Sequence, residues 1–160
     1  MTYPDGQDIE LPNTKIIRIW KIPLIGEAPV GFSFKKLSYD FMMFFAVLWK
    51  TLASRYDVIH AVEEAVYIAL LCGPLKGSQV VYDMDSSMAD QLLEKWPRLT
   101  KLKNLLYGFE GLAIRHSDRV IAVCQALLDK TESYRSNTPV DLLTDTVLEF
   151  ENDTNESAEK

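Results

Sequence analysis

Cysteine and histidine are scarce in this sequence. It contains two of each among 160 residues, and Cys72 and Cys124 lie too far apart to form a C-x-x-C motif. Two histidines and two cysteines at these spacings do not match a zinc site, and a disulfide framework needs more cysteines. We therefore expect no metal and no cofactor, and a chain that works in a reducing, cytoplasmic setting.

An excess of basic charge is also lacking. The net charge is −6, and the last ten residues contribute −3 of it. Nucleic acid needs a basic face to bind its phosphates, so we expect no nucleic-acid partner. The acidic, polar stretch 151–160 is typical of a disordered tail. Residues 1–150 are long enough and apolar enough for one globular domain.

No long hydrophobic run is present. The run 41–49 has nine apolar residues, whereas a helix that spans a bilayer needs about 20. Two interpretations of this run remain. Aromatic and Met residues at helical spacing usually pack in a core, which is the interpretation we favour. The alternative is a helix that lies on the membrane surface at the cytoplasmic face.

Signals for strands and helices alternate along the chain. The expected strands are rich in β-branched and apolar residues and cover 15–22, 58–61, 79–82 and 119–123, with a frayed strand inside 139–150. The expected helices run from Ser33 or Ser38 to about Ser54, then over 63–72, 88–95, through 99–113, and over 126–134. This alternation predicts an α/β fold with a Rossmann-like parallel sheet and helices on both of its faces.

Polar side chains gather where two of these strands end. In open parallel sheets the ligand crevice lies beyond the carboxyl ends of the strands. We therefore expect one cleft to be lined by His60, Glu63, Glu64, Asp83, Asp85, Ser86 and Ser87.

The two aspartates allow two interpretations. Asp83 and Asp85 lie two residues apart, on the same side of an extended strand. One could act as a base, or the pair could bind a metal. Alternatively, they cap the following helix together with Ser86 and Ser87.

The other charged candidates have structural alternatives too. His60 can orient a hydroxyl or a phosphate, or bond to a neighbouring loop. Glu63 and Glu64 suit the positive start of a helix dipole, and one of them could accept hydrogen bonds from a polyol. Glu110 and Arg115 are expected either on the surface of the long helix or in local pairs.

Three segments resemble the amino-terminal lobe of the family 4 glycosyltransferases, which have the GT-B fold. They read DVIHA at 57–61, VVYDMDSS at 80–87 and EGLAIRHSDRVIAVCQAL at 110–127. In the last segment Arg115, Ser117 and Asp118 lie before the strand, as in the family. The resemblance covers roughly residues 15–135.

The resemblance implies a part of a retaining glycosyltransferase, which moves a sugar from a nucleotide-sugar donor to an acceptor. This chain would be the acceptor-side lobe, and the acceptor would be a sugar, a lipid or a small molecule. The family's first strand and Gly-rich loop would precede Thr2, and its donor-binding lobe would follow, so the sequence looks truncated. Glu151 and Glu159 have the E-x7-E spacing of the donor site, which we attribute to chance in an acidic tail.

Two other functions are kept as alternatives. The strand that ends in Asp83 and Asp85 also resembles the D-x-D motif of magnesium-dependent phosphatases of the haloacid dehalogenase type. A non-enzymatic interaction domain is the second alternative, because an exposed sheet edge or the apolar run 41–49 would invite a partner.

Overall fold

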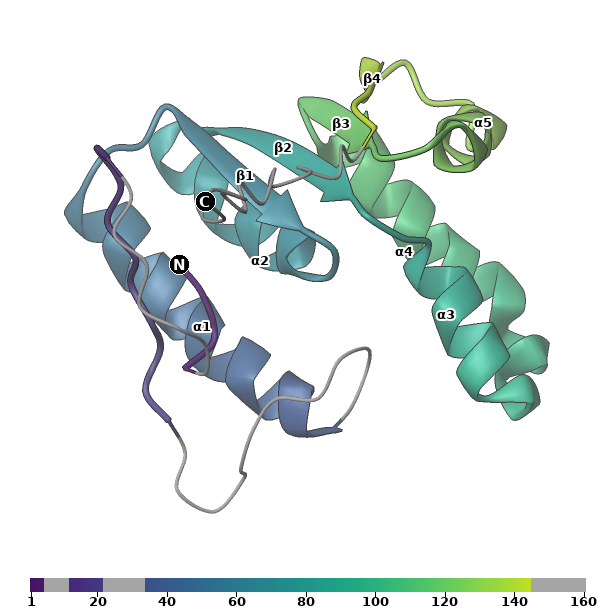
Figure 1. The fold of residues 1–160 in the computed structure, drawn as a ribbon, viewed down its shortest axis with the longest axis horizontal. Coiled ribbons are helices and arrows are strands. Elements are labelled where there is room, and N and C mark those ends of the chain that lie inside the picture. The colour runs from purple at the N-terminus through teal and green to yellow at the C-terminus, as the bar shows by residue number, and fades with distance from the viewer. Residues whose placement is uncertain (5–11, 22–33, 145–160) are drawn as a thin grey trace, which may run out of the picture.

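A four-stranded parallel sheet organises the computed structural model, which describes residues 1–4, 12–21 and 34–144. The strands lie in the order β1-β2-β3-β4, and every neighbouring pair is parallel. Their bounds are Val58–Val62 for β1, Gln79–Met84 for β2, Arg119–Ala122 for β3 and Val140–Leu142 for β4. The expected Rossmann-like α/β fold is confirmed (Figure 1).

Helices connect the strands at nearly the positions that the sequence predicts. They are α1 Phe34–Ala53, α2 Ala65–Cys72, α3 Met88–Lys95, α4 Lys103–His116 and α5 Gln125–Ser133. Two 3₁₀ turns, η1 Gly73–Lys76 and η2 Pro97–Leu102, extend α2 and precede α4. Both turns contain a proline near their start, where the missing N–H costs no hydrogen bond.

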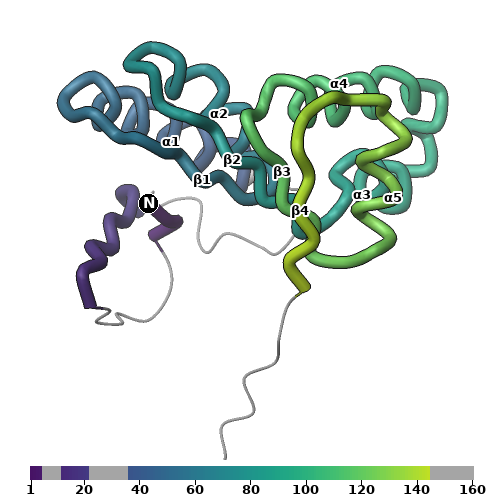
Figure 2. The backbone as a smooth tube through the Cα atoms, turned by 90° about the horizontal axis from the view of Figure 1, so that it is seen from above, coloured from purple at the N-terminus to yellow at the C-terminus, as the bar shows by residue number. Residues whose placement is uncertain are grey.

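The main core lies on one face of the sheet. Along β2 the side chains of Val80, Tyr82 and Met84 are buried, and those between them are more exposed, as the two-residue period of a strand requires. The buried side chains form one cluster with residues of α2, α4 and α5. Figure 2 shows α2 and α4 on one side of the strands. On the opposite face the described side chains are half-buried or exposed, including those of Val58 and Val62.

A second, smaller core joins α1 to the amino-terminal segment. Ile19 packs with Tyr39 and Met43 of α1, and Ile68 of α2 borders the same cluster. The prediction that 15–22 forms a strand of the sheet is wrong. Among the described residues, this segment makes a single parallel bridge, from Thr2 to Arg18. The expected tail 151–160 and the cap Ser33 lie outside the described residues.

Adding a methyl group at Gly77 and at Gly108 should have opposite effects on the free energy of unfolding. Gly77 caps η1 in the left-handed region with φ +75°, whereas Gly108 lies within α4, and no atom lies within 4 Å of an added Cβ at either position. We expect Gly77→Ala to lower the free energy of unfolding by about 1 kcal/mol, because an L side chain strains this backbone. Gly108→Ala should raise it by about 0.5–1 kcal/mol. Urea unfolding measures both, and a stabilising Gly77→Ala would contradict the left-handed cap.

Candidate active site

The carboxyl ends of β1 and β2 bring two of the expected residues into contact. His60 of β1 and Asp83 of β2 lie on the same face of the sheet, and the His60 Nε2 atom is 2.8 Å from the Asp83 Oδ2 atom. A carboxylate can only accept, so Nε2 donates when Asp83 is ionised, which leaves Nδ1 of a neutral ring as an acceptor. Asp83 therefore fixes both the tautomer and the orientation of the His60 ring.

Glu63 adopts an unusual backbone conformation immediately after β1. Its φ is +49°, in the left-handed region, which costs a non-glycine residue about 1–2 kcal/mol. Its N–H donates to the Asp83 carbonyl at 3.1 Å. This turn also explains why α2 begins at Ala65 and not at Glu63, where the sequence predicts its start. The conformation directs the Glu63 carboxylate to Ser86, which donates to it at 3.3 Å.

Lys36 of α1 links the two neighbouring glutamates. Its Nζ atom lies 3.3 Å from Glu63 Oε2 and also forms an ion pair with Glu64. Burial lowers the pKa of Lys36, but the two carboxylates outweigh this effect and leave the pKa above its ordinary value. Lys36 is therefore cationic at neutral pH, and it holds both carboxylates at the same place.

A pocket of about 380 Å³ opens beside these groups. Its walls come from β1, the start of α2, α1 and the first three residues of the chain. The polar lining residues are Thr2, Tyr3, Lys36, His60, Glu63 and Glu64, and the apolar ones include Met43, Val47, Ile59 and Ile68. A concave site with an apolar floor and a few convergent polar groups is the usual form of a small-molecule site.

The remaining expected residues separate into two groups. Ser86 stays near the pocket through its bond to Glu63, but Ser87 turns away and caps α3, where it accepts from the Asp90 N–H at 3.2 Å. Asp85 follows the end of β2 and is exposed. Asp83 lies inside β2, which runs two residues further than the sequence predicts. Among the residues expected to cap the following helix, Ser87 is the N-cap of α3.

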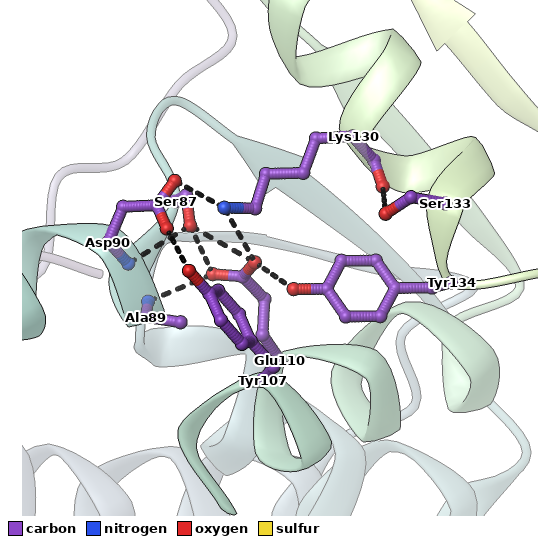
Figure 3. Close-up of polar contacts among 8 residues, drawn as sticks. All are labelled: Ser87, Ala89, Asp90, Tyr107, Glu110, Lys130, Ser133 and Tyr134. Carbon is purple, nitrogen blue, oxygen red and sulfur yellow. Dashed lines mark hydrogen bonds and ion pairs between the residues drawn. The ribbon is translucent and has the colours of Figure 1, made fainter. Parts of the chain in front are cut away.

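A buried carboxylate outside the expected set lies behind Ser87. The Glu110 side chain is fully buried, so the surface position that the sequence suggested is wrong. Its carboxylate accepts hydrogen bonds from Ser87 Oγ at 2.9 Å, the Ala89 N–H at 3.0 Å and the Tyr134 hydroxyl at 2.5 Å. Figure 3 shows this carboxylate between side chains of α3, α4 and α5 and Tyr134, which follows α5.

Lys130 and Asp90 complete this second cluster. Lys130 forms an ion pair with Asp90 and lies 3.9 Å from Glu110, and the Tyr107 hydroxyl donates to Asp90 at 2.8 Å. Burial raises the pKa of Asp90, but the bonds from Lys130 and Tyr107 outweigh it and hold the pKa below its ordinary value. The ionised carboxylate therefore stabilises the fold above about pH 4, and this contribution is lost on acidification.

The sequence itself indicates that Glu110 faces the core. Glu110 follows Leu106 by four residues and precedes Ala113 and Ile114 by three and four, so it lies on the core-facing side of the helix. A carboxylate there must find several donors. For Lys36 no such signal existed, because its glutamate partners are separated from it by 27 and 28 positions in the sequence.

Removing the hydroxyl of Tyr134 or of Tyr82 should affect the free energy of unfolding differently. The Tyr134 hydroxyl donates to the buried Glu110 carboxylate, whereas the buried Tyr82 hydroxyl has no hydrogen-bond partner among the described residues. We expect Tyr134→Phe to lower the free energy of unfolding by about 2 kcal/mol. Tyr82→Phe should leave it unchanged or raise it, because an unpaired polar group is removed. Denaturant unfolding tests the pair, and an equal loss in Tyr82→Phe would reveal a partner for its hydroxyl.

In residues 1–4, 12–21 and 34–144, no group of three His, Cys, Asp or Glu side chains is placed to hold a metal ion. No helix in the same part of the chain is long and apolar enough to cross a membrane. No family model matches the sequence, and no curated protein matches it significantly.

Proposed function

We propose that this chain is the acceptor-side lobe of a glycosyltransferase that moves a sugar from a nucleotide-sugar donor. The observation that carries the proposal is the pocket at the end of β1, which is lined by one imidazole, two carboxylates and one ammonium group together with apolar side chains. The three segments that resemble family 4 enzymes also fall on β1, on β2 with its following turn, and on the α4-β3-α5 unit. They occupy this order in a parallel sheet, as the resemblance requires.

The pocket suits a polyol or sugar acceptor. Carboxylates accept hydrogen bonds from hydroxyl groups, and Lys36 can donate to a ring or hydroxyl oxygen. The Glu63 and Glu64 carboxylates line the pocket, and Met43, Val47 and Ile68 offer an apolar surface to the C–H face of a sugar ring. Lys36 holds the two carboxylates in place through its ion pairs.

His60 is the group we assign to orienting the acceptor. Asp83 accepts from its Nε2 atom, so Nδ1 can accept a proton or a hydrogen bond from an acceptor hydroxyl. Stabilisation of the leaving diphosphate is electrostatic, and it would come from a donor-binding lobe. By itself this chain should therefore bind the acceptor and transfer little sugar.

The phosphatase alternative finds no comparable support. Its nucleophile and its acid need two carboxylates that converge on one phosphate. Asp83 is instead engaged by His60 on the sheet face, and Asp85 lies beyond the strand and is exposed.

The variant Glu63→Gly should weaken acceptor binding while leaving the stability of the fold almost unchanged. Glycine adopts φ +49° without strain, so we expect the free energy of unfolding to change by less than about 1 kcal/mol. The carboxylate is lost, so acceptor binding should fall. The measurement is protein-observed ¹H–¹⁵N NMR with glucose, N-acetylglucosamine and myo-inositol as probes. At least one probe should shift amide signals of residues 60–64 in the natural chain, and these shifts should vanish in Glu63→Gly.

Arg135→Gly is the matched control. Arg135 has nearly the same backbone conformation, with φ +50°, and does not line the pocket beside His60. It should gain the same backbone relief and keep all probe shifts. The absence of shifts at residues 60–64 with every probe, or their persistence in Glu63→Gly, would contradict a polyol site at the end of β1.

A further inference from the structure

A continuous apolar stripe runs along the exposed side of α1. Its members recur every three or four residues, so they share one face of the helix. They are Leu37, Phe41, Phe45, Trp49 and Leu52, and each is at least half exposed, from 51% for Leu52 to 73% for Trp49. The Phe41 and Phe45 rings pack edge to face with centroids 4.9 Å apart.

The described part of the fold leaves this stripe exposed. The opposite side of α1 supplies the buried residues Tyr39, Met43 and Thr51, and it packs on α2 and the amino-terminal segment. The sequence favoured core packing for the run 41–49. This prediction is confirmed for Met43 and is wrong for Phe41, Phe45 and Trp49. Soluble monomers rarely expose such a contiguous apolar surface unless it binds something.

A second tryptophan extends the stripe. Trp20 is 84% exposed, and it lines the same pocket as Trp49, Arg18 and Lys50. The amino-terminal segment therefore places an exposed indole and cationic side chains beside one end of the helix. Tryptophan is enriched at the depth of lipid headgroups, because its ring is apolar and its N–H is polar.

Basic residues outnumber acidic ones in the segments that carry the stripe and Trp20. Residues 12–21 together with α1 carry six basic residues and one acidic residue, Asp40, although one of the six, Lys36, is buried and paired with Glu63 and Glu64. The Tyr3 hydroxyl donates to Asp40, and Asp40 is not on the stripe. The whole chain carries a net charge of −6, so this region is a local exception. Basic residues around an apolar helical face complement anionic lipid headgroups.

We propose that α1 and Trp20 dock on the surface of a bilayer that contains anionic lipid. The stripe inserts at the boundary between headgroups and acyl chains, with the helix parallel to the membrane plane, and Arg18 and Lys50 lie at headgroup level. A helix of 20 residues is about 30 Å long, and an apolar stripe on one side fits an interfacial helix and not a spanning one. The inference does not rest on the proposed glycosyl transfer.

The test is co-sedimentation of the full chain with vesicles, and Phe45→Glu is the diagnostic variant. Vesicles of phosphatidylcholine with about a third phosphatidylglycerol should bind the natural chain more tightly than pure phosphatidylcholine. Phe45→Glu should weaken binding at least about tenfold, because it removes one buried aromatic ring and adds a repelled charge. Phe109→Glu is the matched control, since Phe109 of α4 and Phe45 are both 52% exposed, and it should bind as the natural chain does.

A second measurement leaves the five stripe residues of α1 unchanged. With Trp20→Phe and Trp96→Phe as background, Trp49 is the only indole, and brominated lipids in the same vesicles should quench its emission. Failure to bind the anionic vesicles, equal losses in both glutamate variants, or an unquenched Trp49 would overturn the proposal. So would a dimer of the natural chain that Phe45→Glu dissociates without any vesicle binding, because the stripe would then be an interface between two copies.

Discussion

Every described strand of the sheet runs in the same direction, and this constraint determines where the chemistry lies. Parallel strands in sequence order bring all their carboxyl ends to one edge. His60 and Asp83 meet there although 23 residues separate them. The strained turn at Glu63 bonds to the same edge through the Asp83 carbonyl, and Lys36 reaches it from α1. The candidate site follows from strand direction more than from any single motif.

Two polar clusters at this edge have different consequences. Glu110 is fully buried and accepts bonds from Ser87, Ala89 and Tyr134, so it fixes the start of α3 relative to α4 and the end of α5. A buried carboxylate that lost these donors would be costly. The cluster of Lys36, Glu63 and Glu64 instead lines a pocket, and the Glu63 and Glu64 side chains keep 27% and 21% of their surface exposed. Burial therefore separates a structural cluster from a candidate binding cluster.

The sequence predicted the fold better than the site. Hydrophobic periodicity and the positions of Gly and Pro located β1, β2, β3 and the helices within a few residues, because these signals are local. Periodicity could not show that α1 exposes Phe41, Phe45 and Trp49, since a helix with apolar residues on all sides does not reveal which side is covered. It also missed the left-handed turn at Glu63, which glutamate rarely adopts. The link from Lys36 to both glutamates depends on tertiary packing of α1.

The acceptor-lobe account depends on a partner lobe that binds the donor. The most direct measurement is to sequence the coding DNA on both sides of this reading frame. The account predicts in-frame coding upstream for a strand and a Gly-rich loop, and downstream for a second α/β lobe with its own Glu-x7-Glu pair. A start signal immediately before Met1 and a stop codon immediately after Lys160 would contradict it, and would leave the membrane-docking surface of α1 as the better guide to function.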